Sequence, residues 1–235
     1  MNAGGGKSPC YPLRDMSYWE HKKKLIHPDG WEGGSIMKLP VIAISREYGS
    51  GGRAVGEQAA RALGIPFYDN ELILQTARET GLSEEYIRST EETKASGFFF
   101  GLGAGARQQA NDELFEVQSR IIRQIAEKGP CVIVGRCGDY ILRDREDLLS
   151  VFIHAPIELR AKRAGEVYGV EADDLEDYVK KEDKRRAAFY SHVTKNKWGD
   201  ASRYRMALST VYGVDYAVEI LKNAALAFAR QREEA

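Results

Sequence analysis

The hydrophobic positions of the chain fall into short continuous runs separated by longer amphipathic stretches. The apolar runs at 41–45, 131–134 and 149–153 are typical of strands buried on both faces of a parallel sheet. Two shorter runs, at 65–68 and 204–208, predict further strands. The sequence therefore predicts five strands spread along most of the chain.

Apolar residues recur at helical spacing between these runs. Gly64 marks the end of the first predicted helix, and Asp69 and Ser83 are suited to cap later ones. Because strands alternate with helices, we expect an α/β fold in three layers, with helices on both faces of a parallel sheet. The predicted helices span 52–63, 70–79, a segment after Ser83, 112–128, 139–142, 156–167, a stretch from Asp173 or Asp174 to about 190, and 214–230.

Two stretches lack this regular pattern. Residues 1–36 contain clustered glycines and prolines without a sustained period, which predicts an N-terminal tail or arm that is partly ordered at most. The main domain is then expected over 37–235. Residues 94–110 are too rich in glycine for regular structure, and Phe98–Phe100 within them fit either a mobile loop on the substrate side or an apolar contact patch.

Composition narrows the class of protein. The 235 residues carry a formal net charge of −1, which provides no general attraction to nucleic acid or to anionic membranes. No apolar run has the length of a membrane span. Cys10, Cys131 and Cys137 show no paired spacing and suit reduced thiols. We expect a cytoplasmic monomer or homodimer that binds neither nucleic acid nor membrane.

The stretch 41–56 carries the clearest chemical signal. Its apolar run meets Gly49, Gly51 and Gly52, and an alanine-rich helical pattern follows at once. This order places backbone N–H groups and a helix N-terminus around one anion, most often a phosphate. We therefore expect a nucleotide to bind at this glycine turn. The predicted contacts are Gly49, Ser50, Gly51, Gly52, Arg53 and Ala54.

The glycine turn lacks the lysine of the usual phosphate-binding loop, because Gly52 stands in its place. No side-chain hydroxyl follows Gly52, since the next residues are Arg53 and Ala54. Backbone amides can still form a cradle for phosphate. We expect the missing charge to come from Arg53 or from Arg46, because a guanidinium fork matches phosphate oxygens.

Polar residues also follow two other predicted strands. Arg136 comes just past 131–134, and Asp69 comes directly after 65–68. Side chains past the carboxyl ends of parallel strands line the ligand crevice. We therefore assign Arg136 to the phosphate or base of an acceptor, a second molecule that binds beside the nucleotide. Asp69 is expected to bind the acceptor, to cap the next helix, or to do both. No cluster with the spacing of metal ligands is predicted.

Four segments of the chain form one pattern by their order and spacing: Ser45–Arg53, Phe67–Asp69, Val134–Arg136 and Ala155–Arg163. Together with the later runs 182–186 and 198–200, this pattern resembles the cytidylate kinase-like family of nucleoside-monophosphate kinases, within the P-loop kinases. The resemblance covers most of the chain after the N-terminal arm.

The resemblance implies a P-loop kinase fold with a five-stranded parallel sheet, an ATP site at the glycine turn, Mg²⁺, and a separate side for the monophosphate. It also implies a basic helical lid, over about 165–205, that closes on the transferring phosphate. By this resemblance Arg163 and Arg186 are catalytic cations of the lid, and they join Arg53, which we expect to act from the glycine turn.

Three functions are in competition. The leading hypothesis is a kinase that uses ATP and Mg²⁺ to phosphorylate a nucleoside monophosphate or a similar small acceptor. The second is a nucleotide-binding sensor without turnover, for which the absent lysine argues. The third is an interaction protein that uses Phe98–Phe100 and the N-terminal arm.

Overall fold

The computed structural model describes residues 39–70, 73 and 104–234. Its strands form one parallel sheet in the order β2-β3-β1-β4-β5, which confirms the five-stranded parallel sheet. The strands are β1 (Val41–Arg46), β2 (Phe67–Tyr68), β3 (Val132–Val134), β4 (Leu148–His154) and β5 (Met206–Ser209).

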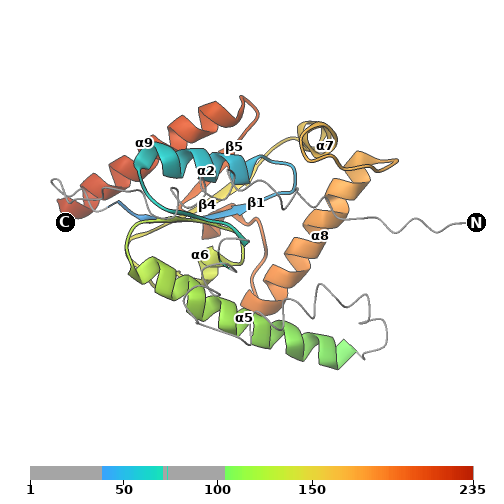
Figure 1. Ribbon diagram of the computed structural model, residues 1–235, viewed down its shortest axis with the longest axis horizontal. Coiled ribbons are helices and arrows are strands. Elements are labelled where there is room, and N and C mark those ends of the chain that lie inside the picture. Colours follow the sequence, from blue (N-terminus) through green and yellow to red (C-terminus); the bar gives the residue numbers. More distant parts are fainter. Residues whose placement is uncertain (1–38, 71–72, 74–103, 235) are drawn as a thin grey trace, which may run out of the picture.

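Helices cover both faces of the sheet, as Figure 1 shows, so the three-layer architecture is confirmed. On one face, α2 (Gly52–Leu63) packs against α9 (Val214–Glu233). On the other lie α5 (Ala104–Glu127) and α6 (Gly138–Ile141). Because β1 leads into α2 on one face and β3 into α6 on the other, a ligand crevice is expected past the carboxyl ends of these two adjacent strands.

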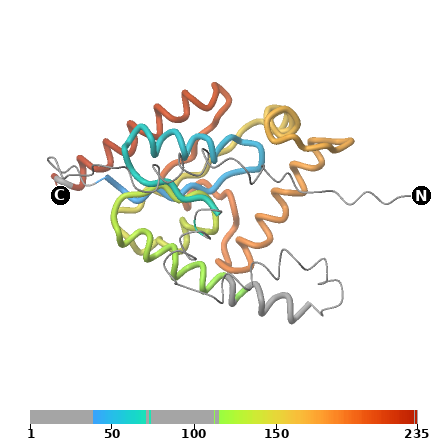
Figure 2. Tube along the Cα trace, viewed as in Figure 1, coloured from blue at the N-terminus to red at the C-terminus, as the bar shows by residue number. Residues whose placement is uncertain are grey.

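Two helices lie beyond the carboxyl ends of the strands. They are α7 (Ile157–Glu166) and α8 (Leu175–Thr194), and the tube in Figure 2 follows the chain from β4 through both before it returns to β5. A short 3₁₀ helix at Ala201–Arg203 completes this return. Asp174 caps α8 by accepting a hydrogen bond from the amide of Asp177 at 2.8 Å.

The core forms where the apolar runs of the strands meet the small residues of α2. Phe67, Ile42 and Ile133 are fully buried. Gly56 allows α2 to approach the sheet closely, since a Cβ atom there would lie 2.8 Å from Cγ2 of Val134. Gly64 ends α2 in the left-handed conformation, as predicted.

Two details of the sequence prediction were wrong. Residues 104–110 are helical and form the start of α5, because the glycines thin out after Gly103 and good helix formers follow. The last strand begins at Met206 instead of Tyr204. Tyr204 packs against Phe152 with ring centroids 5.2 Å apart. The amide of Arg205 donates to Oγ of Ser150 instead of to the backbone of a neighbouring strand.

The predictions for 1–36, for most of 70–79, for the helix after Ser83 and for Phe98–Phe100 concern residues outside the described part of the chain. Within that part, no helix combines the length and apolar character that a membrane crossing needs.

Candidate active site

The glycine turn between β1 and α2 presents several amides that have no acceptor among the residues that the structure describes. Gly49 and Gly51 adopt φ angles of +76° and +80°, which glycine tolerates without strain. The amide of Ser50 donates to the carbonyl of Glu47. The amides of Gly49, Gly51 and Gly52 donate to no residue in the described part of the chain. The turn thus has the form of an anion-binding nest.

Two contacts from distant parts of the chain fix the shape of the turn. Oγ1 of Thr210, after β5, donates to the carbonyl of Ser50 at 2.7 Å. Nη1 of Arg163 on α7 donates to the carbonyl of Gly49 at 2.6 Å. The turn is therefore held in one conformation before any ligand binds, which lowers the cost of binding.

Arg160 connects α7, α8 and the turn. Its side chain is 9% exposed, donates to the carbonyls of Ala155 and Tyr48, and forms an ion pair with Asp183 of α8. Asp183 in turn accepts a hydrogen bond from the amide of Tyr48 at 2.7 Å. With Glu47 also 3.3 Å from Nε of Arg160, this guanidinium has a structural role in bracing the turn.

The structure brings two of the three predicted catalytic cations to the turn. Arg163 lies so close that a Cβ atom on Gly51 would be 3.3 Å from its Cζ. Nη1 of Arg186 on α8 donates to the carbonyl of Arg46 at 3.0 Å, and its guanidinium lies 5.1 Å from the ring centre of Tyr48. Burial lowers the pKa of Arg186.

Arg53 is the third predicted catalytic cation, and its side chain points toward the β2 side of the crevice. Its Nη2 lies 2.8 Å from Oδ2 of Asp69, and its Nη1 lies 3.0 Å from Oε2 of Glu57. Two carboxylates therefore balance its charge. The structure joins Arg53 and Asp69, two predicted site residues, in one ion pair.

Arg136 belongs to an unusual turn after β3. Gly135, Arg136 and Cys137 have consecutive φ angles of +84°, +54° and +55°. Left-handed conformations cost about 1–2 kcal/mol for each residue other than glycine, and such strain concentrates at functional sites. The side-chain amide of Gln118 supports the turn by donating to the carbonyl of Arg136 at 3.1 Å.

Cys137 carries no reactive thiolate. Burial raises the pKa of its thiol to about 12, so the thiol stays protonated near neutral pH. The residue is also buried, with 6% exposure.

Sequence reasoning missed a buried polar network beneath the turn. Oγ of Ser45 donates to Oδ1 of Asp139 at 2.9 Å, and the hydroxyl of Tyr190 donates to Oδ2 at 2.6 Å. The network joins β1, α6 and α8. Burial raises the pKa of Asp139 above its ordinary value, although both hydrogen bonds oppose this effect.

This pKa shift predicts a pH dependence of stability. Because the folded state holds the Asp139 proton more tightly, the group's stabilisation is complete below about pH 4 and is lost as pH rises through the folded-state pKa. Replacing Asp139 with Asn removes this loss. We expect the free energy of unfolding of Asp139→Asn, relative to the unmodified protein, to rise with pH in urea titrations.

The control for this prediction is Asp144→Asn, whose side chain is 84% exposed. Its free energy of unfolding should stay within about 0.5 kcal/mol of the unmodified protein at every pH. Parallel pH profiles for Asp139→Asn and the unmodified protein would contradict the assignment.

The described residues do not build a magnesium site by themselves. No three His, Cys, Asp or Glu side chains among them are placed to hold a metal ion. Asp69 is ion-paired with Arg53, and Asp139 is bonded to Ser45 and Tyr190. We therefore derive no catalytic step through a metal held by protein ligands.

The sheet order, the glycine turn after β1 and the basic helices at its carboxyl edge define the P-loop kinase class. The chain belongs to the cytidylate kinase-like family, whose model matches residues 41–212. The resemblance found in the sequence is thereby confirmed.

Individual relatives agree with this family. A cytidylate kinase of Methanopyrus kandleri is 23% identical over 195 residues, which cover 78% of this chain and 92% of that protein. The crystal structure of an uncharacterized protein from Eubacterium ventriosum has a TM-score of 0.61 at 28% identity and covers 79% of this chain and 98% of its own.

A third comparison supports the fold alone. The structure of TT1252 from Thermus thermophilus has a TM-score of 0.53 at 19% identity, over 81% of this chain and 98% of its own. Taken with the family, these similarities support a kinase activity on a nucleotide or another small molecule.

Proposed function

We propose that this protein transfers the terminal phosphoryl group of ATP to a nucleoside monophosphate or a similar small acceptor. The proposal is carried by one observation. Turn amides that have no acceptor in the described part of the chain converge with the guanidinium groups of Arg163 and Arg186. Phosphoryl transfer needs positioning and neutralised charge more than covalent help from the protein. Mg²⁺ would enter with the triphosphate, bound by phosphate oxygens and water.

On the donor side, the segment from Gly49 to Ala54 would cradle the phosphates of ATP, with the amides of Gly49, Gly51 and Gly52 as hydrogen-bond donors. Arg163 and Arg186 would move from the carbonyls that they now contact to the oxygens of the transferring group. Both belong to the helices beyond the sheet edge, so their approach would also exclude water from the site. The family relationship and the position of both helices support this lid role.

On the acceptor side, Arg136 would bind the phosphate or base of the acceptor, and Asp69 its polar groups. Asp69 is 7% exposed and lies at the end of β2, on the same side of the crevice as the β3 turn. In this proposal Arg53 acts through Asp69, which it holds by an ion pair, instead of through the γ-phosphate.

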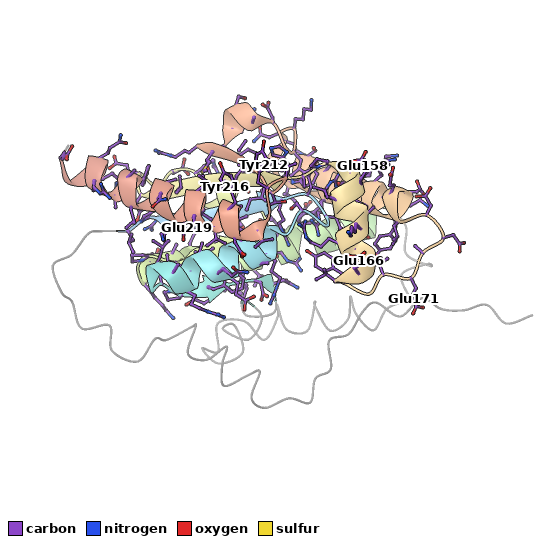
Figure 3. The ribbon with its side chains drawn as sticks, turned by 90° about the horizontal axis from the view of Figure 1, so that it is seen from above. Glu158, Glu166, Glu171, Tyr212, Tyr216 and Glu219 are labelled. Carbon is purple, nitrogen blue, oxygen red and sulfur yellow. The ribbon has the colours of Figure 1, made fainter. Side chains whose placement is uncertain are left out.

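In this proposal an exposed aromatic pair would bind the base of ATP. Tyr212 and Tyr216 are 78% and 50% exposed, with ring centroids 5.6 Å apart. Figure 3 shows both at the N-terminal end of α9, near Glu219. The segment is adjacent to the turn, because a Cβ atom on Gly51 would lie 3.1 Å from Cγ2 of Val214.

Replacing Tyr212 with Ala is expected to weaken ATP binding. Stacking of a base on an aromatic ring contributes about 1–3 kcal/mol, so the dissociation constant should rise roughly 5- to 150-fold. Isothermal titration calorimetry measures this change. Tripolyphosphate, which has no base, is the matched control and should bind both proteins equally. An unchanged ATP affinity places the base elsewhere.

The proposed function is tested by calorimetry with ATP and a coupled assay of ADP release with CMP, dCMP, UMP and AMP as acceptors. Binding of ATP together with acceptor-dependent ADP release supports the proposal. ATP binding without ADP release for any acceptor refutes the kinase and favours the nucleotide-binding sensor. If ATP does not bind, both functions fail and an interaction role is left.

A further inference from the structure

The usual phosphate-binding loop has a lysine at the position of Gly52. In this chain the side chain of Arg46 occupies the space next to that position, so only glycine fits there. A Cβ atom on Gly52 would lie 2.7 Å from Cβ and 3.0 Å from Cγ of Arg46. Real Cβ atoms do not tolerate the shorter contact, and the atom that it meets is the stiff base of the arginine. A lysine at position 52 and this placement of Arg46 therefore exclude each other.

The guanidinium of Arg46 extends from the glycine turn to the end of the neighbouring strand. A Cβ atom on Gly135 would lie 2.1 Å from Nη1 and 2.9 Å from Cζ of Arg46. Position 135 follows β3, and Arg46 ends β1. The positive charge thus lies at the crevice between these adjacent strands, next to the N-terminus of α2.

Within the described part of the chain, no carboxylate is paired with this guanidinium. It donates no hydrogen bond and forms no ion pair with the described residues. Arg186 and Arg136 add positive charge beside it, while the opposing carboxylate, Asp69, is ion-paired with Arg53. A mostly buried cation without a hydrogen-bonded partner is costly, and an anionic ligand would supply that partner.

The protonation of Arg46 is consistent with this role. Burial, followed by the charges of Arg186 and Arg136, lowers the pKa of Arg46 to about 9. The side chain therefore remains a cation near neutral pH, and a bound anion would raise the pKa again.

We propose that Arg46 takes the place of the missing lysine and binds the β- and γ-phosphates of ATP from the end of β1. The inference rests on the proposed function, to which it adds the residue that supplies the charge. A guanidinium can hold two phosphate oxygens at once, so one arginine is sufficient for a contact that a lysine makes as a point charge.

The first test replaces Arg46 with Met, which keeps an unbranched stem as far as about the position of Nε and removes the charged guanidinium. Charge-assisted hydrogen bonds predict that ATP binds about 10- to 150-fold more weakly by calorimetry. The thermal midpoint of the ligand-free protein should stay equal or rise, because an uncompensated buried cation is lost. Opposite effects on binding and stability distinguish a ligand contact from a structural role.

Arg143→Met is the matched control, because its side chain is 48% exposed and pairs with Asp144 away from the turn. It should leave ATP affinity unchanged. If Arg46→Met binds ATP like the unmodified protein, the inference fails while the proposed function stands. If the unmodified protein itself binds no ATP, the proposed function fails.

A second test relocates the charge. Arg46→Gly removes the atoms that meet position 52, and the double variant Arg46→Gly/Gly52→Lys restores the usual lysine. We expect the double variant to bind ATP at least about tenfold more tightly than Arg46→Gly, because the ammonium then reaches the same phosphates. Equal ATP affinity of the two variants would contradict a shared place for the two cations.

Discussion

Replacing Gly49 with Ala is expected to abolish measurable ATP binding. With φ at +76°, a Cβ atom at this position would lie 2.5 Å from the carbonyl oxygen of Arg160 and 2.9 Å from its carbon. These are backbone atoms of α7, so no side-chain rotation relieves the contact. The turn must move away from α7, and its amide N–H groups then no longer point toward one bound phosphate. We expect at least about a hundredfold loss of affinity in calorimetry.

Gly64→Ala is a matched control for this variant. Gly64 has a similar φ of +66°, yet a Cβ atom there would meet nothing within 4 Å. Its replacement should cost about 1–2 kcal/mol of stability through backbone strain and leave ATP affinity unchanged. If the two alanine variants bind ATP equally well, close packing of the turn against α7 has no part in the site.

Replacing Arg163 with Ala is expected to lower kcat/KM for ATP about 10²- to 10³-fold, the usual loss when one donor to the developing charge is removed. Arg163 reaches the turn from α7 and donates to the carbonyl of Gly49, and in the proposed function its guanidinium would rotate onto the bound phosphate. Most of the loss should appear in kcat, because the charge to be stabilised is largest in the transition state.

The neighbouring Lys162 provides the control for Arg163, since it carries the same charge on the same helix and its side chain is exposed. Lys162→Ala should change kcat/KM less than about threefold, because an exposed charge away from the site is screened by solvent. Equal losses in the two variants would mean that the general charge of α7, and not a contact of Arg163, supports the reaction.

Much of the fold was predictable because its signals are local. The buried strands are continuous apolar runs, and Gly64 and Asp174 mark helix ends by their own conformational and hydrogen-bonding preferences. The start of α5 was not predictable in the same way. Gly103 and Gly105 favour irregular structure in the sequence pattern, although residues 104–110 form the first part of the long helix α5.

The candidate site was predictable only in part, because side-chain directions depend on elements far apart in the chain. Sequence left the missing charge open between Arg53 and Arg46. The pairing of β2 with β3 places Asp69 within reach of Arg53 and draws that guanidinium away from the turn. The contact of Thr210 with the turn spans 160 residues and has no signal in the sequence.

The most direct test of the account is a crystal structure with a non-hydrolysable ATP analogue. We expect the β- and γ-phosphates within hydrogen-bonding distance of the amides of Gly49, Gly51 and Gly52, with the guanidinium of Arg46 on the same oxygens. A structure in which the analogue binds elsewhere, or in which these amides bond to other parts of the chain and Arg46 contacts no phosphate, would contradict it.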